Sequence, residues 1–291
     1  MSDSRLNCEF PETDIQQQLE KRFYRTFGER LASPPARKVG GVSDSSVDMG
    51  HSIANFNDRF IDVRTDFLTK RLGLLPVINI FMVVVLLLMW IADQFYSGAL
   101  LATALLLLPL WTGFIVYEIF CPYTLPVRID RSEDFVYVAH RGTFYRVPWD
   151  ELEVTFSYNF QYMGSGVAWS RQYYSHVFLR QKYYFCGKPP KSSIQRKRLS
   201  SYFDENKIYR KWNFIVRFYQ EGLNKEDCSN LETANYDLYV ETLNNSSFLA
   251  YILDYLSLIL FVPTMIWAKF SPFKYKWPSE IEEVFGKANY Y

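Results

Sequence analysis

LGLLPVINIFMVVVLLLMWIA (residues 72–92) and ALLATALLLLPLWTGFIVY (residues 99–117) are two long apolar runs separated by a short polar break. Neither run contains Asp, Glu, Lys or Arg. At 1.5 Å per helical residue the first run would extend about 31 Å, close to the hydrocarbon thickness of a bilayer, about 30 Å. Because helices of soluble domains are rarely apolar on every side, the sequence predicts a transmembrane helical hairpin over residues 72–121.

Basic residues flank the predicted hairpin on both sides. They are Arg59, Arg64, Lys70 and Arg71 before the first run and Arg128 and Arg131 after the second. The break between the runs contains Asp93 and no basic residue. By the positive-inside rule, we expect a multi-pass protein whose two termini both lie in the cytoplasm.

Composition argues against a nucleic-acid-binding protein and against a metal centre. Across 291 residues, 32 Lys and Arg balance 31 Asp and Glu, whereas nucleic-acid-binding surfaces are strongly basic. The four cysteines are far apart and there are three histidines, so no zinc-type ligand spacing occurs. We therefore predict no nucleic-acid partner, no metal and no cofactor.

The rest of the chain is predicted to form three parts around the hairpin. Residues 1–50 contain an amphipathic pattern over 12–31, typical of a helix, and then a Pro-, Gly- and Ser-rich linker. Residues 51–71 form a juxtamembrane segment, for which a helix and a strand added to a later sheet both fit. Residues 122–291 are predicted to form a cytoplasmic α+β domain.

Short runs of Val, Phe and Tyr separated by turn residues occur over residues 127–186, the pattern of an antiparallel β meander. We predict four to six strands, with turns at Arg141–Thr143 and Met163–Gly166 and an edge or bend at Pro148. IYRKWNFIVRFYQEG (208–222) fits a strand and a helix equally well, with its final glycine as the stop of a helix.

FLAYILDYLSLILFVPTMIWAKF (248–270) is a third apolar run, but it contains Asp254 and Pro263. We predict an apolar helix at the inner membrane surface or packed on the domain, with a true span as the alternative. In the tail KWPSEIEEVFG (276–286), Pro278 is expected at the start of a helix.

The loop KPPKSSIQRKRLSS (188–201) carries the main candidate site. Its cations are predicted either to contact anionic lipid headgroups or to lie on a solvated loop: Lys188, Lys191, Arg196, Lys197 and Arg198. His140 has no second ligand or nucleophile at motif spacing, so we interpret it as an ordinary strand residue.

Catalytic motifs are missing from the sequence. Asp150, Glu151 and Glu153 offer carboxylates, but their position after Trp149 at a strand start predicts a solvated edge. The sequence has no Ser-His-Asp, Cys-His, HExxH or phosphate-loop pattern. We therefore predict no catalytic residue and no enzymatic activity.

Four motifs follow the apolar hairpin in a recognisable order. They are PVRIDRSEDFVYV (126–138), VPWDEL (147–152), WNFIVRFYQEG (212–222) and WPSEI (277–281). Over about residues 67–285 the chain resembles a bacterial family of uncharacterised two-helix membrane proteins often encoded beside type VI secretion genes in Gram-negative bacteria. The resemblance implies an inner-membrane location and a helix over 209–221.

The same resemblance implies a function. Family members encoded beside toxin genes are expected to act as immunity or accessory proteins that bind a cognate effector or secretion component. A hairpin followed by a small β domain is also similar to bacterial membrane-tethered pleckstrin-homology-like domains. This second likeness implies the alternative function, a scaffold that binds the lipid bilayer or a protein partner.

Overall fold

The structure, a computed structural model, describes residues 28–32, 35, 52–65, 78, 81–92, 99–162, 169–224, 266–267 and 270–288. The chain divides into two compact units. The first unit consists of residues 1–66, 125–236 and 277–289, and the second of residues 67–124, 237–276 and 290–291. Each unit is described by itself below.

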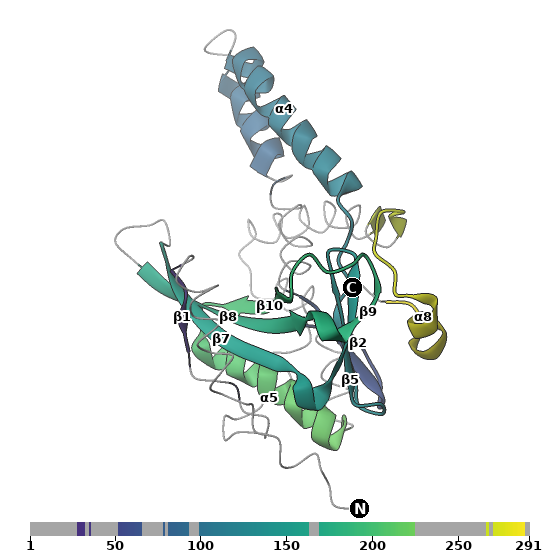
Figure 1. Cartoon of the computed structure of the whole chain (residues 1–291). Coiled ribbons are helices and arrows are strands. Elements are labelled where there is room, and N and C mark those ends of the chain that lie inside the picture. The colour runs from purple at the N-terminus through teal and green to yellow at the C-terminus, as the bar shows by residue number, and fades with distance from the viewer. Residues whose placement is uncertain are drawn as a thin grey trace, which may run out of the picture. The chain divides into compact units, whose positions relative to one another are not determined.

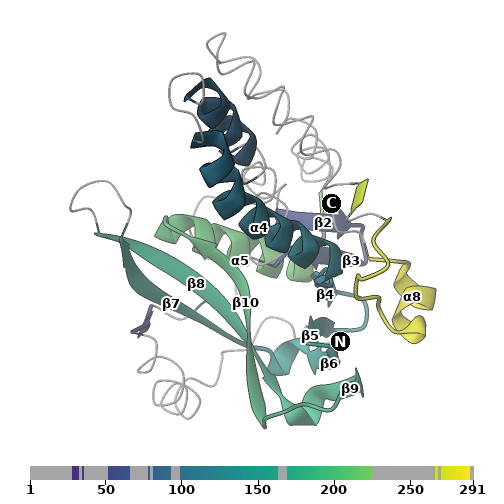
Figure 2. The same cartoon turned by 90° about the horizontal axis from the view of Figure 1, so that it is seen from above.

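A six-stranded antiparallel sheet lies in the first unit, with the strand order β2-β3-β4-β5-β6-β9 (Figures 1 and 2). Its strands are β2 (Ile53–Phe56), β3 (Phe60–Val63), β4 (Val127–Asp130), β5 (Phe135–His140), β6 (Thr143–Pro148) and β9 (Tyr184–Gly187). β2 and β3 come from the segment 51–71. Because β3 pairs with β4, the strand alternative for that segment is confirmed.

A second antiparallel sheet has four strands in the order β1-β7-β8-β10. Its strands are β1 (Arg30–Leu31), β7 (Glu153–Tyr162), β8 (Trp169–Arg180) and β10 (Ile194–Tyr202). The predicted single meander is therefore divided between two sheets. β7 pairs with β8 along its whole length, as expected for strands joined by a hairpin turn.

The bend predicted at Pro148 is where the chain passes from one sheet to the other. β6 ends at this proline, and the short 3-10 helix η4 (Trp149–Glu151) leads into β7. The Trp149 ring stacks on the ring of Tyr219, with centroids 4.2 Å apart, and lies parallel to Trp212 at 6.0 Å. Both partners belong to one helix, so the bend is packed against it.

That helix is α5 (Glu205–Glu221), which confirms the helical alternative for residues 208–222. The Asp204 side chain caps its start by accepting a hydrogen bond from the Asn206 amide, and Gly222, at φ 86°, ends it. α5 contacts β8 and β10 and lies along the four-stranded sheet (Figures 1 and 2). Its apolar face and the inner faces of both sheets form one core.

The other face of the six-stranded sheet is covered by the segment that contains Trp277 and α8 (Ser279–Phe285). Pro278 directly precedes α8, as predicted. The Phe285 ring packs edge-on against Phe60, with centroids 5.4 Å apart, and against Tyr137 at 5.7 Å. Strand alternation explains the two buried faces, because neighbouring residues point to opposite sides of a sheet.

The second unit corrects the central prediction. Residues 81–92 are helical, and α4 (Ala99–Phe120) contains Pro109 and, near its end, the buried Glu118, which accepts a hydrogen bond from Tyr123. Among the residues that the structure describes, no helix is both long enough and apolar enough to cross a membrane. The predicted transmembrane hairpin over 72–121 is therefore wrong.

The physical reasons lie in α4. In α4, Pro109 removes one helical hydrogen bond, and an ionisable group such as Glu118 is costly in hydrocarbon. The predicted multi-pass inner-membrane location and the cytoplasmic placement of the termini, which both depend on the hairpin, are corrected with it.

The structure tests three other predictions only in part. Residues 30–31 form a strand, so the helix predicted over 12–31 cannot reach its predicted end, and residues 12–27 lie outside the described part. The linker predicted over 33–50 lies outside it as well, except for residue 35. So does most of the apolar run 248–270, of which residues 266–267 and 270 are described, as helix.

Candidate functional site: a cationic pocket

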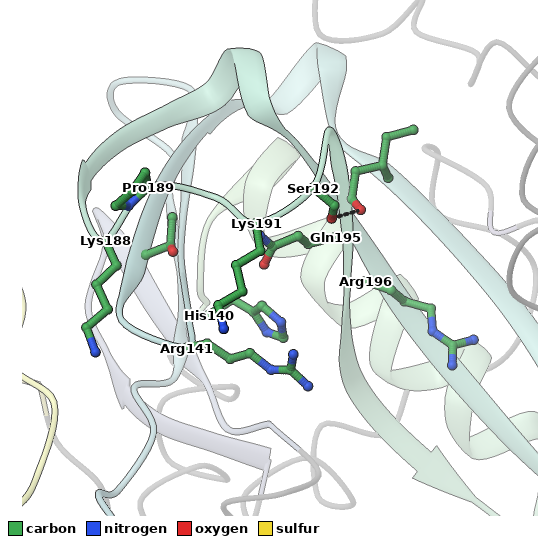
Figure 3. Close-up of a pocket in the computed structure, with 10 residues that line it drawn as sticks. His140, Arg141, Lys188, Pro189, Lys191, Ser192, Gln195 and Arg196 are labelled. Atoms are coloured by element: carbon green, nitrogen blue, oxygen red, sulfur yellow. Dashed lines mark hydrogen bonds between the residues drawn. The ribbon is translucent and has the colours of Figure 1, made fainter.

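A pocket of about 320 Å³ lies in the first unit, between the turn that joins β5 to β6 and the loop that joins β9 to β10 (Figure 3). The residues that line it are His140, Arg141, Thr143, Lys188, Pro189, Lys191, Ser192, Ile194, Gln195 and Arg196. Four of these described lining residues are Arg or Lys, and none is Asp or Glu. The pocket is therefore strongly cationic.

The turn between β5 and β6 supplies one wall. Arg141 and Gly142 both have positive φ angles, 54° and 84°, which is the geometry of a two-residue type I′ hairpin turn. This turn pairs His140 with Thr143 and leaves Arg141 exposed at its tip. The turn predicted at these residues is confirmed, and it places a cation at the mouth of the pocket.

The loop between β9 and β10 supplies the opposite wall. It begins against the hairpin, because the Lys188 amide donates a hydrogen bond to the Gly142 carbonyl at 2.9 Å. At its other end the Ser192 hydroxyl donates to the Ile194 carbonyl at 2.8 Å. Lys188 and Lys191 are exposed between these anchors, and Figure 3 shows the side chains of Lys191 and Arg141 directed toward His140.

Gly187 allows the loop to approach the hairpin this closely. Its φ is 88°, and a Cβ added there would lie 2.5 Å from the Gly142 carbonyl oxygen and 2.8 Å from the Phe144 ring. Any other residue would push β9 away from β6. The shape of the pocket therefore depends on this glycine.

His140 lies on the pocket wall in a positive environment. Burial, followed by the charges of Lys197 and Arg141, lowers the pKa of His140 from 6.5 to about 4. At neutral pH the imidazole is therefore uncharged, with one N–H donor and one nitrogen acceptor. It provides a hydrogen bond to a ligand but no fixed charge.

Lys197 lies behind the same wall. Its ammonium donates hydrogen bonds to the carbonyls of Ala139, at 2.6 Å, and Leu125, at 3.3 Å. Burial lowers the pKa of Lys197 to about 7. The prediction that Lys197 contacts a surface ligand directly does not fit this position.

Arg196 and Arg198 lie on the opposite face of β10 from Lys197, because neighbouring strand residues alternate. The guanidinium of Arg196 donates to the Glu29 carboxylate at 2.8 Å, and Arg198 lies 3.9 Å from the same carboxylate. Arg198 also lies over the Tyr174 ring, 4.3 Å from its centroid. Of the five predicted cations, the pocket brings together Lys188, Lys191 and Arg196.

A serine, a histidine and a glutamate also meet on the four-stranded sheet. The Ser157 hydroxyl lies 3.4 Å from Nδ1 of His176 and donates to Glu29 at 3.2 Å. In a catalytic triad the acid would orient the histidine, whereas here it accepts from the serine. Ser157 and His176 are at most 1% exposed, and burial lowers the pKa of His176 well below 6.5, so this group is a buried hydrogen-bond network.

The carboxylates after Trp149 do not form a site. Glu151 is exposed and accepts hydrogen bonds from Lys182 and Tyr183, while Glu153 accepts one from Arg180 at 2.5 Å. The predicted solvated edge fits Asp150 and Glu151, which are exposed, but not Glu153, whose side chain is 12% exposed. A search of the described residues finds no cluster of three His, Cys, Asp or Glu side chains able to hold a metal ion.

No protein-family model, no curated protein and no solved structure matches this chain.

Sequence reasoning missed the residues that the hairpin contributes, above all His140, Arg141 and Thr143. The turn itself was predicted, but nothing in the local pattern places it beside a loop almost 50 positions later. The available signal was the pair of cations in that loop, Lys188 and Lys191, because both immediately follow a strand that returns to the same sheet.

Proposed function

We propose that this chain binds an acidic segment of a partner protein in the cationic pocket and does not catalyse a reaction. Following the resemblance, the partner is a toxin, effector or other component of a type VI secretion system, and the chain is its immunity or accessory protein. The observation that carries the proposal is the lining of the pocket, whose described residues include four Lys and Arg and no Asp or Glu; of the four, Arg196 is paired with Glu29 behind the lining.

The charges of the pocket favour an acidic partner. Arg141, Lys188 and Lys191 are exposed, and they lie on the two opposing walls. Charges at the rim of an interface mainly speed association with a partner of opposite sign and repel partners of the same sign. The Debye length at physiological salt is about 8 Å, so we expect binding to weaken as salt is raised.

The size and the remaining lining suit a short piece of chain. A volume of about 320 Å³ is at the lower end of the usual range of ligand pockets, about 300–1,000 Å³. Pro189 and Ile194 give it apolar surface, and Gln195 and Thr143 add polar groups. An Asp or Glu side chain has both a carboxylate for the cations and methylenes for the apolar wall.

The chemistry of the same residues supports recognition over catalysis. His140 has a pKa of about 4 and is therefore a weak base, and the described lining contains no acid to orient it as a general base. The Ser192 hydroxyl donates to a backbone carbonyl of its own loop. A nucleophile, base and orienting acid facing the pocket would have supported an enzyme.

The decisive experiment is co-expression with the toxin encoded beside the gene. We expect the wild-type chain to protect sensitive cells and the double variant Lys188→Glu/Lys191→Glu to protect them poorly. The purified double variant should bind the toxin at least about tenfold more weakly, a loss of about 1.4 kcal/mol.

The matched control is Lys207→Glu/Lys287→Glu, which makes the same charge change at two exposed residues outside the pocket. Its protection and affinity should remain close to wild type. Killing that is unaffected by the wild-type chain, or equal loss of protection in both double variants, would reject the proposed function.

A further inference from the structure

His140 and Lys197 form a titratable pair at the wall of the pocket. His140 ends β5 and lines the pocket, whereas Lys197 is 7% exposed and lies behind the wall. The Lys197 ammonium donates to the Ala139 carbonyl at 2.6 Å, and this carbonyl belongs to the peptide bond that leads into His140. The charge on each group therefore affects the protonation of the other, and a charge placed in the pocket affects both.

The groups around this pair are cationic. The positive charges of Arg141, in the adjacent turn, and of Lys197, on β10, both disfavour protonation of His140. The other charged side chains of the described lining are Lys188, Lys191 and Arg196, and Glu29 already accepts a hydrogen bond from Arg196. A proton on either member of the pair is therefore opposed by several positive charges.

We infer that the pocket takes up a proton when an acidic group enters it, and that His140 and Lys197 hold this proton. The inference rests on the proposed function, because it requires an anionic group in the pocket. A carboxylate within about 4–6 Å of a basic group raises the pKa of that group by about 1–3 units. The entering acid thus removes the electrostatic cost of the additional positive charge.

Both groups have lowered pKa values before an acidic group enters the pocket. Burial and neighbouring cations lower the pKa of His140 to about 4, and burial lowers the pKa of Lys197 to about 7. An upward shift brings the pKa of His140 into the mildly acidic range and the pKa of Lys197 above neutral pH. Since the bound state holds more protons than the free state, affinity rises as pH falls.

The test is isothermal titration calorimetry of the full chain with a capped tri-glutamate peptide. Titrations in buffers of different ionisation enthalpy, at pH 5.5 and pH 7.5, measure the protons taken up. We expect between about 0.3 and 1 proton per peptide bound. His140→Gln should lower the uptake at pH 5.5, Lys197→Met should lower it at pH 7.5, and Lys207→Met, outside the pocket, should leave it unchanged.

The outcomes separate this inference from the proposed function. Peptide binding without proton uptake, or wild-type uptake in both pocket variants, overturns the inference and leaves the proposed function standing. No peptide binding at either pH, together with no protection against the toxin, overturns both. Because Lys197 is buried and its variant is at risk of unfolding, His140→Gln, at a half-buried surface position, keeps the test valid.

Discussion

Arg128 and Asp62 form a two-pronged ion pair inside the first unit. Nε and Nη2 of the arginine each donate to one carboxylate oxygen at 2.7 Å, and both side chains are 0% exposed. The guanidinium also lies 4.4 Å from the centroid of the Phe60 ring and about 5.5 Å from those of Trp277 and Phe285. The pair therefore joins β3 and β4 to the segment that carries α8.

Removing one member of this pair should be severely destabilising. Arg128→Met leaves the Asp62 carboxylate buried without its ion-pair partner, and we expect a loss of about 3–5 kcal/mol in the free energy of unfolding. The double variant Arg128→Met/Asp62→Leu should recover much of this loss. Urea unfolding monitored by tryptophan fluorescence measures both values, and a single variant within about 1 kcal/mol of wild type would contradict the assigned role.

Gly187 should tolerate no side chain. Gly187→Ala forces a Cβ toward the Gly142 carbonyl and the Phe144 ring, and we expect a loss of about 2 kcal/mol or more. Gly286→Ala is the matched control, because its φ of 79° is similar but open space surrounds it. The control should lose about 1 kcal/mol, the cost of backbone strain alone. Equal losses in thermal unfolding would show that the close approach of the two strands is unimportant.

A variant at Arg141 separates the effect of pocket charge on binding from effects on folding stability. Arg141→Gly removes a cation from the pocket mouth and also places a residue that favours positive φ at a turn position with φ 54°. We expect stability to remain within about 1 kcal/mol of wild type, while affinity for the acidic tri-glutamate peptide falls about fivefold. Calorimetry of the same samples gives both quantities, and unchanged affinity would remove Arg141 from the site.

Lys197 should make stability depend on pH. In the unfolded chain a lysine has a pKa of about 10.4, whereas burial lowers the pKa of folded Lys197 to about 7. Between these values the unfolded state binds more protons, so folding stability should rise with pH, by at most about 1.4 kcal/mol per unit. Below pH 7 Lys197 is protonated in both the folded and the unfolded state, so its cost to folding stability no longer changes with pH.

The measurement compares wild type with Lys197→Met between pH 7 and pH 9 by chemical unfolding. As pH rises, the free energy of unfolding of wild type should increase relative to that of Lys197→Met. A difference that stays constant across this window would mean that the folded pKa is not lowered.

Local backbone chemistry explains the predictions that were confirmed. Pro148 cannot donate a ladder hydrogen bond, so it ends β6, and Pro278 precedes α8 because its missing amide costs nothing there. The turn at Arg141–Thr143 follows from the need for positive φ in a tight hairpin. For residues 208–222 the two periods were equally good, and burial against both sheets selected the helix.

Predictions that required distant partners were the ones that went wrong or stayed open. Hydropathy over residues 72–121 predicted a membrane hairpin, but hydropathy averages over a window and hides a single ionisable residue such as Glu118, which is costly in hydrocarbon. The cations of residues 188–198 were predicted to act as one cluster. In the fold, strand alternation separates Lys197 from Arg196, and Arg196 pairs with Glu29, 167 positions away.

The sequence by itself predicted strands over residues 127–186, the turn at Arg141–Thr143, Gly222 as a helix stop and Pro278 as a helix start, because these depend on residues close together in the chain. It interpreted residues 188–201 as a loop, whereas residues 194–202 form β10 in the fold. Only the tertiary structure decided that β2 and β3 join the later strands, that Arg128 is buried against Asp62, and that His140 faces the loop with Lys188 and Lys191. Such contacts depend on which distant surfaces exclude water together, and no local pattern contains that information.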